Sequence, residues 1–223
     1  MYLYSFFSMH MPTFIPFGEQ QAQAPPMESP VSQRIVTAAR HHYFAHGFRR
    51  VTMDDLAKEL GISKKTLYAS FPSKAALLEA VLMDKFRMVE SDLNEITAGC
   101  SSDVFTALHQ FLVCMQRHTE EIQPPFVRDM RREGPERFKM VEDRRREMIQ
   151  RHFGRLLGEG RKAGIIRKDI PVKLIMEILL GAVQAIMNPP KIAELGLTPK
   201  TGFSTIITVI LEGVITDIAR SKL

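Results

Sequence analysis

The feature that most constrains this chain is an apolar rhythm of about 3.6 residues that runs through nearly every long segment. The alternation of apolar and polar residues that is typical of half-buried strands is not sustained anywhere in the sequence. This pattern predicts an all-α protein. With 223 residues, 45% of them apolar, the chain is long enough to bury a substantial core.

Glycine, proline and helix-capping residues divide the chain into about nine expected helices. Ser63 and Ser73 are candidate N-caps, and Gly61 is a candidate helix terminator. The expected helices span about residues 29–46, 52–61, 63–71, 73–98, 103–118, 124–132, 136–161, 169–187 and 201–220.

The first 27 residues differ in composition from the rest of the chain. They are rich in aromatic residues and proline and contain no lysine or arginine, whereas a secretory signal begins with a positive region. We expect residues 1–27 to be a flexible tail, with Met27 as an alternative start of translation, and the protein to be cytoplasmic. The longest later apolar run, Leu174 to Met187, is shorter than the roughly 20 residues of a membrane span, so we expect no membrane partner.

Few residues in the sequence are arranged for catalysis or metal binding. The two cysteines, Cys100 and Cys114, are too few and too widely spaced for a disulfide framework or a Cys-rich zinc site. A thiol switch through them is disfavoured because neither has a basic neighbour close by in sequence. No paired carboxylates, glycine-rich phosphate loop, nucleophile motif or metal-spaced histidines are evident. We therefore expect no enzyme activity, no cofactor and no metal.

The strongest local signal is a pair of short helices joined by a tight turn, over about residues 52–71. Ala57 is small where two helices must cross closely, and Gly61 supplies the left-handed turn that a side chain would resist. Leu56, Leu60, Ile62 and Leu67 are expected to form a miniature core. This layout is typical of a helix-turn-helix, in which the second helix enters the major groove of DNA.

The distribution of charge supports a nucleic-acid partner. The whole chain carries a formal net charge of +5. Residues 28–75 contain eight Lys or Arg against four Asp or Glu, so this segment carries a net +4. A basic cluster on one short segment is the electrostatic footprint expected of a DNA-binding unit.

Residues 47–78, GFRRVTMDDLAKELGISKKTLYASFPSKAALL, carry a family pattern. The pattern is a Gly-aromatic pair, a Thr that opens a helix, an apolar-Ala pair, Gly-apolar-Ser, Leu-Tyr-x-x-Phe, and Ser-Lys two residues after that Phe. With these motifs, residues 28–90 resemble the N-terminal domain of the tetracycline-repressor (TetR) family. Many members carry His immediately before the Phe, where this chain has Ser70, which puts a DNA backbone contact there in doubt.

The resemblance implies roles at matching positions. Thr52 and Tyr68 would hydrogen-bond phosphates, and Lys74 would meet a phosphate at a helix N-terminus, where the helix dipole favours an anion. The first turn of the second helix would approach base edges or nearby phosphates. The implied DNA-binding residues are Thr52, Ser63, Lys64, Lys65, Thr66, Tyr68 and Lys74. The alternatives are solvated surface charge for the lysines and a core position for Tyr68.

The last two long expected helices, 169–187 and 201–220, are apolar nearly all round, whereas a helix at the surface of a monomer has a polar face. Such helices are either central or shared with another chain. The resemblance implies a homodimer in which this helix pair packs on the same pair of a second chain as a four-helix bundle. The two DNA-binding units of such a dimer would bind the two half-sites of an inverted repeat. The expected interface residues are Leu179, Val183, Ile207, Ile210 and Val214.

Within the expected helix 136–161, Arg145 and His152 fall in the middle of an apolar stripe, which is costly for a cation unless it is paired. One interpretation is an effector pocket lined by Arg145, His152, Met115 and Met148 that takes a small, apolar or amphipathic molecule. The alternatives are an ion pair between Arg145 and Glu142, and methionines that fill the core.

These expectations combine into one hypothesis of organisation and function. A tail (1–27), a DNA-binding domain (28–75) and a helical effector-binding and dimerisation domain (76–223) would make a ligand-responsive transcriptional regulator. A repressor is expected, in which effector binding moves the helix at 73–98 and lowers affinity for double-stranded operator DNA. The alternatives are a helical scaffold or adaptor without DNA binding and an all-helical enzyme.

Overall fold

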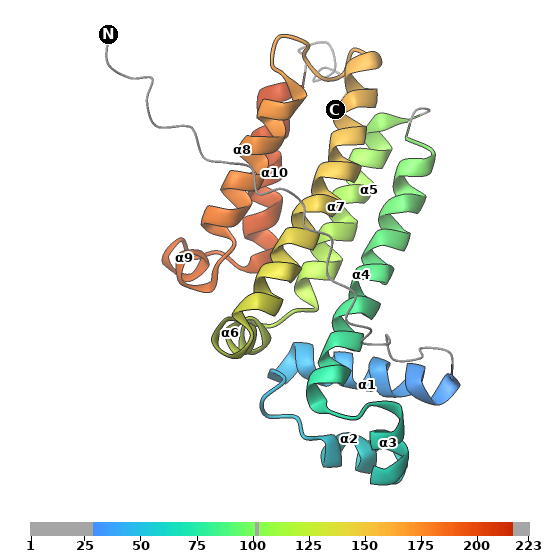
Figure 1. The fold of residues 1–223 in the computed structure, drawn as a ribbon. Coiled ribbons are helices and arrows are strands. Elements are labelled where there is room, and N and C mark those ends of the chain that lie inside the picture. Colours follow the sequence, from blue (N-terminus) through green and yellow to red (C-terminus); the bar gives the residue numbers. More distant parts are fainter. Residues whose placement is uncertain (1–28, 101–102, 216–223) are drawn as a thin grey trace.

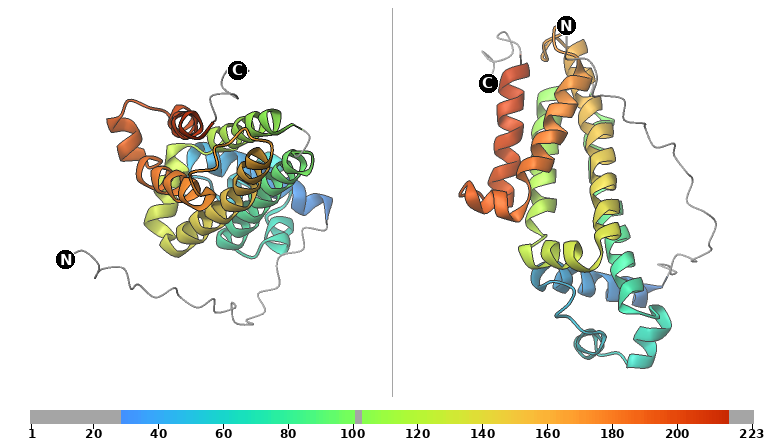
Figure 2. Two further views of the ribbon diagram at one scale, coloured as in Figure 1. Left: turned by 90° about the horizontal axis from the view of Figure 1, so that it is seen from above. Right: turned by 60° about the vertical axis from the view of Figure 1, so that its left-hand side comes forward.

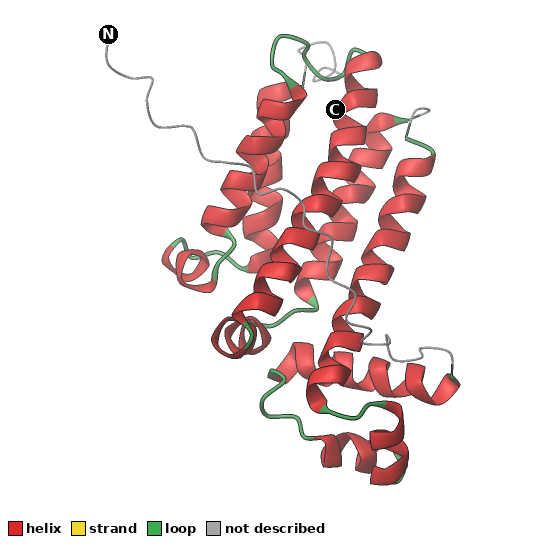
Figure 3. Ribbon diagram, viewed as in Figure 1, coloured by secondary structure: helices red, strands yellow, loops and turns green. Residues whose placement is uncertain are grey.

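A computed structural model describes residues 29–100 and 103–215, and these ranges contain helices and loops but no extended sheet (Figure 3). The all-α prediction is confirmed. The helices are α1 (Pro30–His46), α2 (Met53–Leu60), α3 (Lys64–Ser70), α4 (Lys74–Ala98), α5 (Val104–Glu120), α6 (Pro124–Glu133), α7 (Pro135–Lys162), α8 (Val172–Ile186), α9 (Pro189–Glu194) and α10 (Pro199–Val214).

The molecule has a small three-helix unit at one end and a bundle of longer helices above it (Figure 1). We call α1–α3 the head and the remaining helices the body. Helix α4 starts beside the head, where it packs on α1, and continues along α5 and α7. Helices α8 and α10 pack on each other and on α7 and α5, respectively. Helix α6 lies across the junction and contacts both α1 and α7 (Figure 2).

The expected helix starts are explained by side-chain caps. Ser29, Thr52, Ser63, Ser73 and Asp103 each accept a hydrogen bond from the backbone N–H three residues later. Each cap satisfies one of the N–H groups that a helix start leaves without an intrahelical partner. The capping pattern therefore predicts these five helix starts closely.

The region after α8 differs from the prediction. The stretch between 188 and 201 was expected to be a loop but contains α9, so the described residues form ten helices rather than about nine. Asn188 caps α9 by accepting a hydrogen bond from the Lys191 N–H, and two prolines occupy the first turn. Proline ends one helix and favours the first position of the next. The two prolines after Asn188 were taken only as the end of the preceding helix, so the start of α9 was not predicted. The predicted tail 1–27 and the predicted helix end near 220 lie outside the described residues.

One continuous apolar core joins the head to the body. Leu56, Leu67 and Phe71 are fully buried in the head, while Leu60 and Ile62 are only partly buried beside them. Burying each such side chain contributes about 1.5–3 kcal/mol relative to leaving it exposed. The core continues along α4 through Leu77, Val81 and Leu93.

Among the helices in the described ranges, none combines the length and the apolar character that crossing a membrane requires.

Candidate DNA-binding surface

The start of α2 is fixed by a reciprocal pair of hydrogen bonds. The Asp55 N–H donates to Thr52 Oγ1 over 3.1 Å, and the Thr52 N–H donates to Asp55 Oδ2 over 3.2 Å. Thr52 Oγ1 also donates to Asp55 Oδ2 over 2.6 Å. These bonds hold the pKa of the Asp55 carboxyl below its ordinary value. Thr52 is exposed, and its contact with a DNA phosphate stays a prediction.

The turn between α2 and α3 depends on glycine. Gly61 has φ +64° and ψ +30°, which is the left-handed conformation predicted from the sequence. The Ile62 N–H donates to the Ala57 carbonyl over 3.0 Å and closes the turn. Ser63 then caps α3 through the Thr66 N–H at 3.0 Å. The turn therefore directs α3 away from α2 with a defined orientation.

Helix α3 has one buried side and one exposed side. Leu67 is fully buried, and Phe71, immediately after the helix, is buried with it. Tyr68 is 46% exposed and so is not a core aromatic residue. The exposed residues of this side are Ser63, Lys64, Lys65, Thr66, Tyr68 and Ala69. The structure thus brings five of the seven predicted DNA-binding residues onto one continuous helix surface.

The two lysines of α3 differ in their partners. Lys64 Nζ lies 2.5 Å from Asp54 Oδ2, and both side chains are exposed. Lys65 is exposed and has no ion-pair partner among the described residues. The ammonium of Lys65 is therefore available to an anionic ligand. Lys64 could bind such a ligand only by breaking its ion pair with Asp54 or by contacting both groups at once.

Lys74 occupies a more enclosed position than the other predicted contacts. Its Nζ donates to the Arg49 carbonyl over 3.1 Å and lies 6.0 Å from the centre of the Phe48 ring. Partial burial lowers the pKa of the Lys74 ammonium. Lys74 holds the loop before α2 against the start of α4, so it supports the head as well as adding positive charge to it.

Helix α6 forms a second connection between the head and the body, besides α4. The Arg49 N–H donates to Asp129 Oδ2 over 3.0 Å, and Arg49 Nε lies 2.6 Å from Glu133 Oε1. The rings of Phe44 and Phe126 meet edge to face with centroids 4.8 Å apart. Because these contacts come from α6, a movement of α6 would change the orientation of the head.

Three comparisons place this geometry among known proteins. Residues 35–81, which run from α1 into α4, match the model of the bacterial regulatory proteins of the tetR family. An uncharacterised HTH-type transcriptional regulator of Bacillus subtilis, YvaF, is 25% identical over 172 residues, covering 74% of this chain and 86% of YvaF. The part of the chain from α1 into α4 therefore carries the DNA-binding domain of the tetR family of bacterial regulatory proteins.

Solved structures agree with this assignment at the level of the fold. SmeT of Stenotrophomonas maltophilia, in complex with triclosan, aligns with a TM-score of 0.60 and 16% identity over 85% of this chain and 93% of SmeT. KstR2, a ketosteroid transcriptional regulator of Mycobacterium tuberculosis, aligns with a TM-score of 0.54 and 17% identity over 86% of this chain and 98% of KstR2. The match at residues 35–81 and the likeness to YvaF identify the chain as a transcriptional regulator with a DNA-binding helix-turn-helix.

The four residues predicted for an effector pocket have different surroundings in this regulator. Met115, Met148 and His152 are buried in the body, and His152 Nδ1 lies 3.2 Å from Thr97 Oγ1. Arg145 Nη2 lies 2.5 Å from Glu142 Oε2, so the ion pair left open as an alternative is present. Arg145 alone among the four lines a pocket of about 320 Å³ between α7 and α8. Its lining residues are Lys139, Glu142, Asp143, Arg145, Arg146, Ile149, Leu180, Val183 and Gln184.

The residues predicted for the dimer interface lie on the inner faces of α8 and α10. All five are at most 9% exposed within the single chain: Leu179, Val183, Ile207, Ile210 and Val214. They contribute to the body's own core, because both helices have a second apolar face. The outer faces expose Leu174 (50%), Ile178 (52%) and Val209 (65%). The surface that a second chain can reach is therefore formed by other residues of the same two helices.

A group of polar side chains between α4 and α5, two of them buried, was not predicted from the sequence. Asp92, Cys114 and His118 each place a potential metal-ligand atom within 4.8 Å of the others. The four-residue spacing of Cys114 and His118 was the available signal, since it puts both on one helix face. Asp92 lies 22 residues before Cys114 and joins them only through the packing of the two helices.

Proposed function

We propose that this regulator is a repressor that binds an inverted-repeat operator as a homodimer and releases it when a small effector binds. The observation that carries the proposal is the exposed face of α3, which presents Lys65, Thr66 and Tyr68 while Leu67 anchors the helix. A helix with this polarity suits the major groove, where hydroxyl and ammonium groups meet base edges and phosphates.

The proposed DNA-contacting residues carry different parts of the affinity. Lys65 and Thr66, on the first turn of α3, meet base edges or adjacent phosphates, and Lys64 joins them when it leaves Asp54. Ser63, Thr52 and Tyr68 offer hydroxyls to the phosphate backbone. Lys74 acts mainly by positioning the loop before α2.

The proposed dimer uses the outer faces of α8 and α10. Leu174 and Ile178 are one helical turn apart on α8, and Gly181 continues the same stripe. Val209 lies on the corresponding outer face of α10. Burying exposed leucine, isoleucine and valine against a second copy supplies the apolar core that a stable homodimer interface needs. A two-fold axis here would also place two heads on one face of the DNA.

The proposed effector is small and amphipathic and occupies the α7–α8 pocket. A volume of about 320 Å³ lies at the lower end of the range for small-molecule sites. Ile149, Leu180 and Val183 form an apolar wall of the pocket. Arg145 adds a cation, which forms an ion pair with Glu142 through one of its guanidinium nitrogens. SmeT, a protein of the same fold, is in complex with triclosan, which supports a ligand-responsive body. Because α8 also carries the proposed dimer face, a ligand here would change the spacing of the two heads.

The test begins with selection of genomic fragments by the purified protein, which supplies the operator. A labelled operator is then titrated with wild type, Lys65→Ala and Tyr68→Phe. Lys173→Ala is the matched control, since Lys173 is exposed at the first turn of α8, at the end of the body far from the head (Figure 1).

We expect Lys65→Ala to weaken operator binding by about tenfold or more, and to reduce the salt slope by about one if Lys65 meets a phosphate. Tyr68→Phe should weaken binding less, because it removes one hydrogen bond. Lys173→Ala should bind like wild type. Wild-type affinity in both head variants would overturn the assigned surface, and failure to select any double-stranded fragment at low ionic strength would favour a scaffold without DNA binding.

A further inference from the structure

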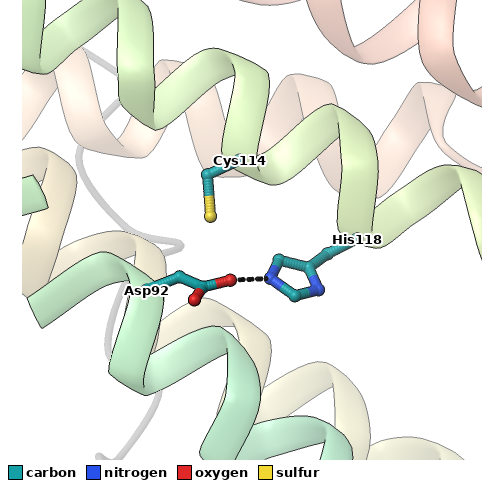
Figure 4. A group of neighbouring side chains, drawn as sticks. All are labelled: Asp92, Cys114 and His118. Carbon is teal, nitrogen blue, oxygen red and sulfur yellow. Dashed lines mark hydrogen bonds and ion pairs between the residues drawn. The ribbon is translucent and has the colours of Figure 1, made fainter. Parts of the chain in front are cut away.

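Three side chains of different chemistry converge between α4 and α5 (Figure 4). Asp92 comes from α4, and Cys114 and His118 come from successive turns of α5. The Cys114 sulfur points into the space bounded by the Asp92 carboxylate and the His118 ring. One ligand atom from each residue lies within 4.8 Å of the other two. A carboxylate, a thiol and an imidazole are thus directed at one small volume.

The contacts of His118 define its protonation. Lys85 Nζ lies 2.9 Å from His118 Nδ1, and His118 Nε2 lies 2.7 Å from Asp92 Oδ2. Because an ammonium only donates hydrogen bonds, Nδ1 accepts from Lys85 and the ring proton sits on Nε2, where it donates to Asp92. The nitrogen that faces Asp92 is therefore the one that would bind a metal after losing this proton.

Burial and access are both suitable for an ion. Cys114 is 4% exposed and His118 is 7% exposed, so both ligands are held by packing. The Asp92 side chain is 35% exposed and leaves an approach from solvent. Arg117 Nη2 lies 2.5 Å from Asp92 Oδ2 and orients this carboxylate from outside, as outer-shell partners commonly do in metal sites.

Sulfur, nitrogen and oxygen donors together suit zinc. Zinc ligands lie about 2.0–2.3 Å from the ion, so tetrahedral ligands are roughly 3.3–3.8 Å apart. Ligand atoms within 4.8 Å of one another reach this geometry by small side-chain rotations. Three protein ligands leave the fourth position open to water or to a donor atom of a bound molecule.

The neighbouring cations are already balanced by carboxylates. Lys85 forms an ion pair with Glu121, and Arg117 forms one with Asp92. On binding, the Cys114 thiol loses its proton and adds a third negative charge to those of Asp92 and Glu121. The two neighbouring cations, Lys85 and Arg117, then face three negative charges, so the site keeps a net negative charge that favours a divalent cation.

We propose that Asp92, Cys114 and His118 form a Zn²⁺ site with one open position, and that its occupation is transmitted to the head through Lys85, Glu121 and Arg40. The proposed Zn²⁺ site is argued from the geometry of the three ligands alone. The proposed transmission to the head rests on the proposed DNA-binding function.

The transmission follows from the proton balance on the His118 ring. For zinc to bind Nε2 while the imidazole stays neutral, the ring proton moves from Nε2 to Nδ1, so that an Nδ1–H donor faces the Lys85 ammonium, which is also a donor. The bond between Lys85 and His118 must break, and Lys85 is left with Glu121. Glu121 Oε1 lies 3.5 Å from Arg40 Nε, and Arg40 Nη1 lies 2.9 Å from Asp84 Oδ2. Arg40 belongs to α1, so a change at His118 reaches the head in two ionic contacts.

Cobalt is the probe for the metal site, because Co²⁺ takes the same ligands and is coloured. Full-length protein freed of metal by chelation is titrated with Co²⁺, and absorption is recorded. We expect saturation at one Co²⁺ per chain, a thiolate-to-cobalt charge-transfer band, and loss of both signals when Zn²⁺ is added. Cys114→Ala should abolish the charge-transfer band.

Two matched variants control for other thiols and imidazoles. Cys100→Ala removes the other cysteine, and His109→Gln removes an exposed histidine of α5, and both should keep the band. Asp92→Asn changes the most exposed ligand and should weaken cobalt binding by at least about tenfold with an unchanged helical circular dichroism spectrum. A wild-type protein without the band, a band retained in Cys114→Ala, or unaltered affinity in Asp92→Asn would each overturn the site.

The link to the head is tested separately on the operator. Zn²⁺ should change the operator Kd of wild type by at least about fivefold, and should leave the Kd of Cys114→Ala unchanged. Glu121→Gln should still bind cobalt but lose the zinc response of the operator Kd. Zinc binding without any change in operator affinity would overturn the transmission. A cobalt band in a protein that binds no DNA fragment would instead overturn the proposed function and leave the site standing.

Discussion

The exposed side of α3 and the outer faces of α8 and α10 are two surfaces without a partner in the chain's described residues, and their chemistry differs. The α3 side exposes hydroxyls, lysines and Tyr68, supported by Leu67 beneath. The α8–α10 side exposes Leu174, Ile178 and Val209. The first suits a hydrated anionic ligand and the second suits another apolar surface. The difference indicates two partners of different kinds, DNA and a second copy of the chain.

The largest effect is expected from a charge placed on the apolar outer face of α8. Ile178→Asp would bury two carboxylates near the two-fold axis of the proposed dimer, and removing those charges from water is costly. We expect the dimer dissociation constant to rise on the order of 100-fold, which corresponds to about 2.7 kcal/mol, with a loss of operator affinity. Sedimentation velocity over a range of concentrations measures the first effect.

The matched control for Ile178→Asp is Val113→Asp on α5. Val113 is 48% exposed, close to the 52% of Ile178, but it lies on a different helix from the proposed interface. Its oligomeric state should not change. Equal sedimentation of both variants and wild type would remove the α8–α10 face as the dimer interface.

The same two surfaces show what the sequence could and could not predict. The head was predictable in detail because its signals are local: Thr52 and Ser63 cap adjacent helices, and Gly61 forms the turn between them. Helix α8 was predictable as a helix but not in orientation. An apolar residue on a helix that is apolar nearly all round has no sequence signal for the face it occupies, so Leu179 was assigned to the interface although it lies in the core.

The body contains a second kind of limit. Asp92, Cys114 and His118 meet only because α4 and α5 pack in one particular register, and long-range register is not encoded in the spacing along a single helix. Arg145 is the opposite case, since its partner Glu142 is three residues away and the pair was foreseeable from helical spacing. The grouping of Met115 with Arg145 in one pocket also depended on register between helices, which is why the sequence could not establish it.

The second prediction concerns the joint that holds the two surfaces in one orientation. Gly47 has φ +83°, and a Cβ there would lie 2.5 Å from Asp129 Oδ2, the oxygen that accepts from the Arg49 N–H. Gly47 also has ψ +147°, a combination of angles that is almost confined to glycine and costs on the order of 1–3 kcal/mol for a residue with a side chain. With displacement of Asp129 added, we expect Gly47→Ala to lower the Tm by roughly 4–8 °C.

Gly61→Ala is the comparison variant, in which an added side chain meets a milder backbone cost and no contact with α6. Gly61 has φ +64°, but a Cβ added there would have no neighbouring atom within 4 Å and would meet open space. The Tm of Gly61→Ala should therefore fall by roughly half as much as that of Gly47→Ala, measured by thermal unfolding followed by circular dichroism. An equal loss in both variants would mean that contact with α6 does not hold the head.

The third prediction tests whether Thr52 serves the head itself or only its ligand. Thr52→Ala removes the cap of α2, which lowers the Tm by roughly 2–4 °C, and Thr52→Ser should recover most of that loss. Because the hydrogen bonds from Thr52 lower the pKa of Asp55, their stabilisation is present above the ordinary aspartate pKa and is lost as the pH falls through the lowered value. Unfolding midpoints measured from pH 7 to pH 3 should therefore fall less steeply in Thr52→Ala than in wild type.

The smallest expected effect is that of Gly181→Ala, whose sign differs between the isolated chain and the proposed dimer. Gly181 lies within α8, and apart from the neighbouring backbone of this helix no atom of the described residues lies within 4 Å of an added Cβ. For an isolated chain, Gly181→Ala should therefore stabilise the helix by about 0.8–1.0 kcal/mol, because alanine is the better helix former. In the proposed dimer the same methyl group stands on the stripe of Leu174 and Ile178, where close approach of two helices favours glycine. We expect the Tm to rise at protein concentrations below the dimer dissociation constant and the dimer to weaken above it. A variant that is more stable at every concentration would show that the partner helix does not approach Gly181, and the two-fold axis would then have to lie nearer to Val209 on α10.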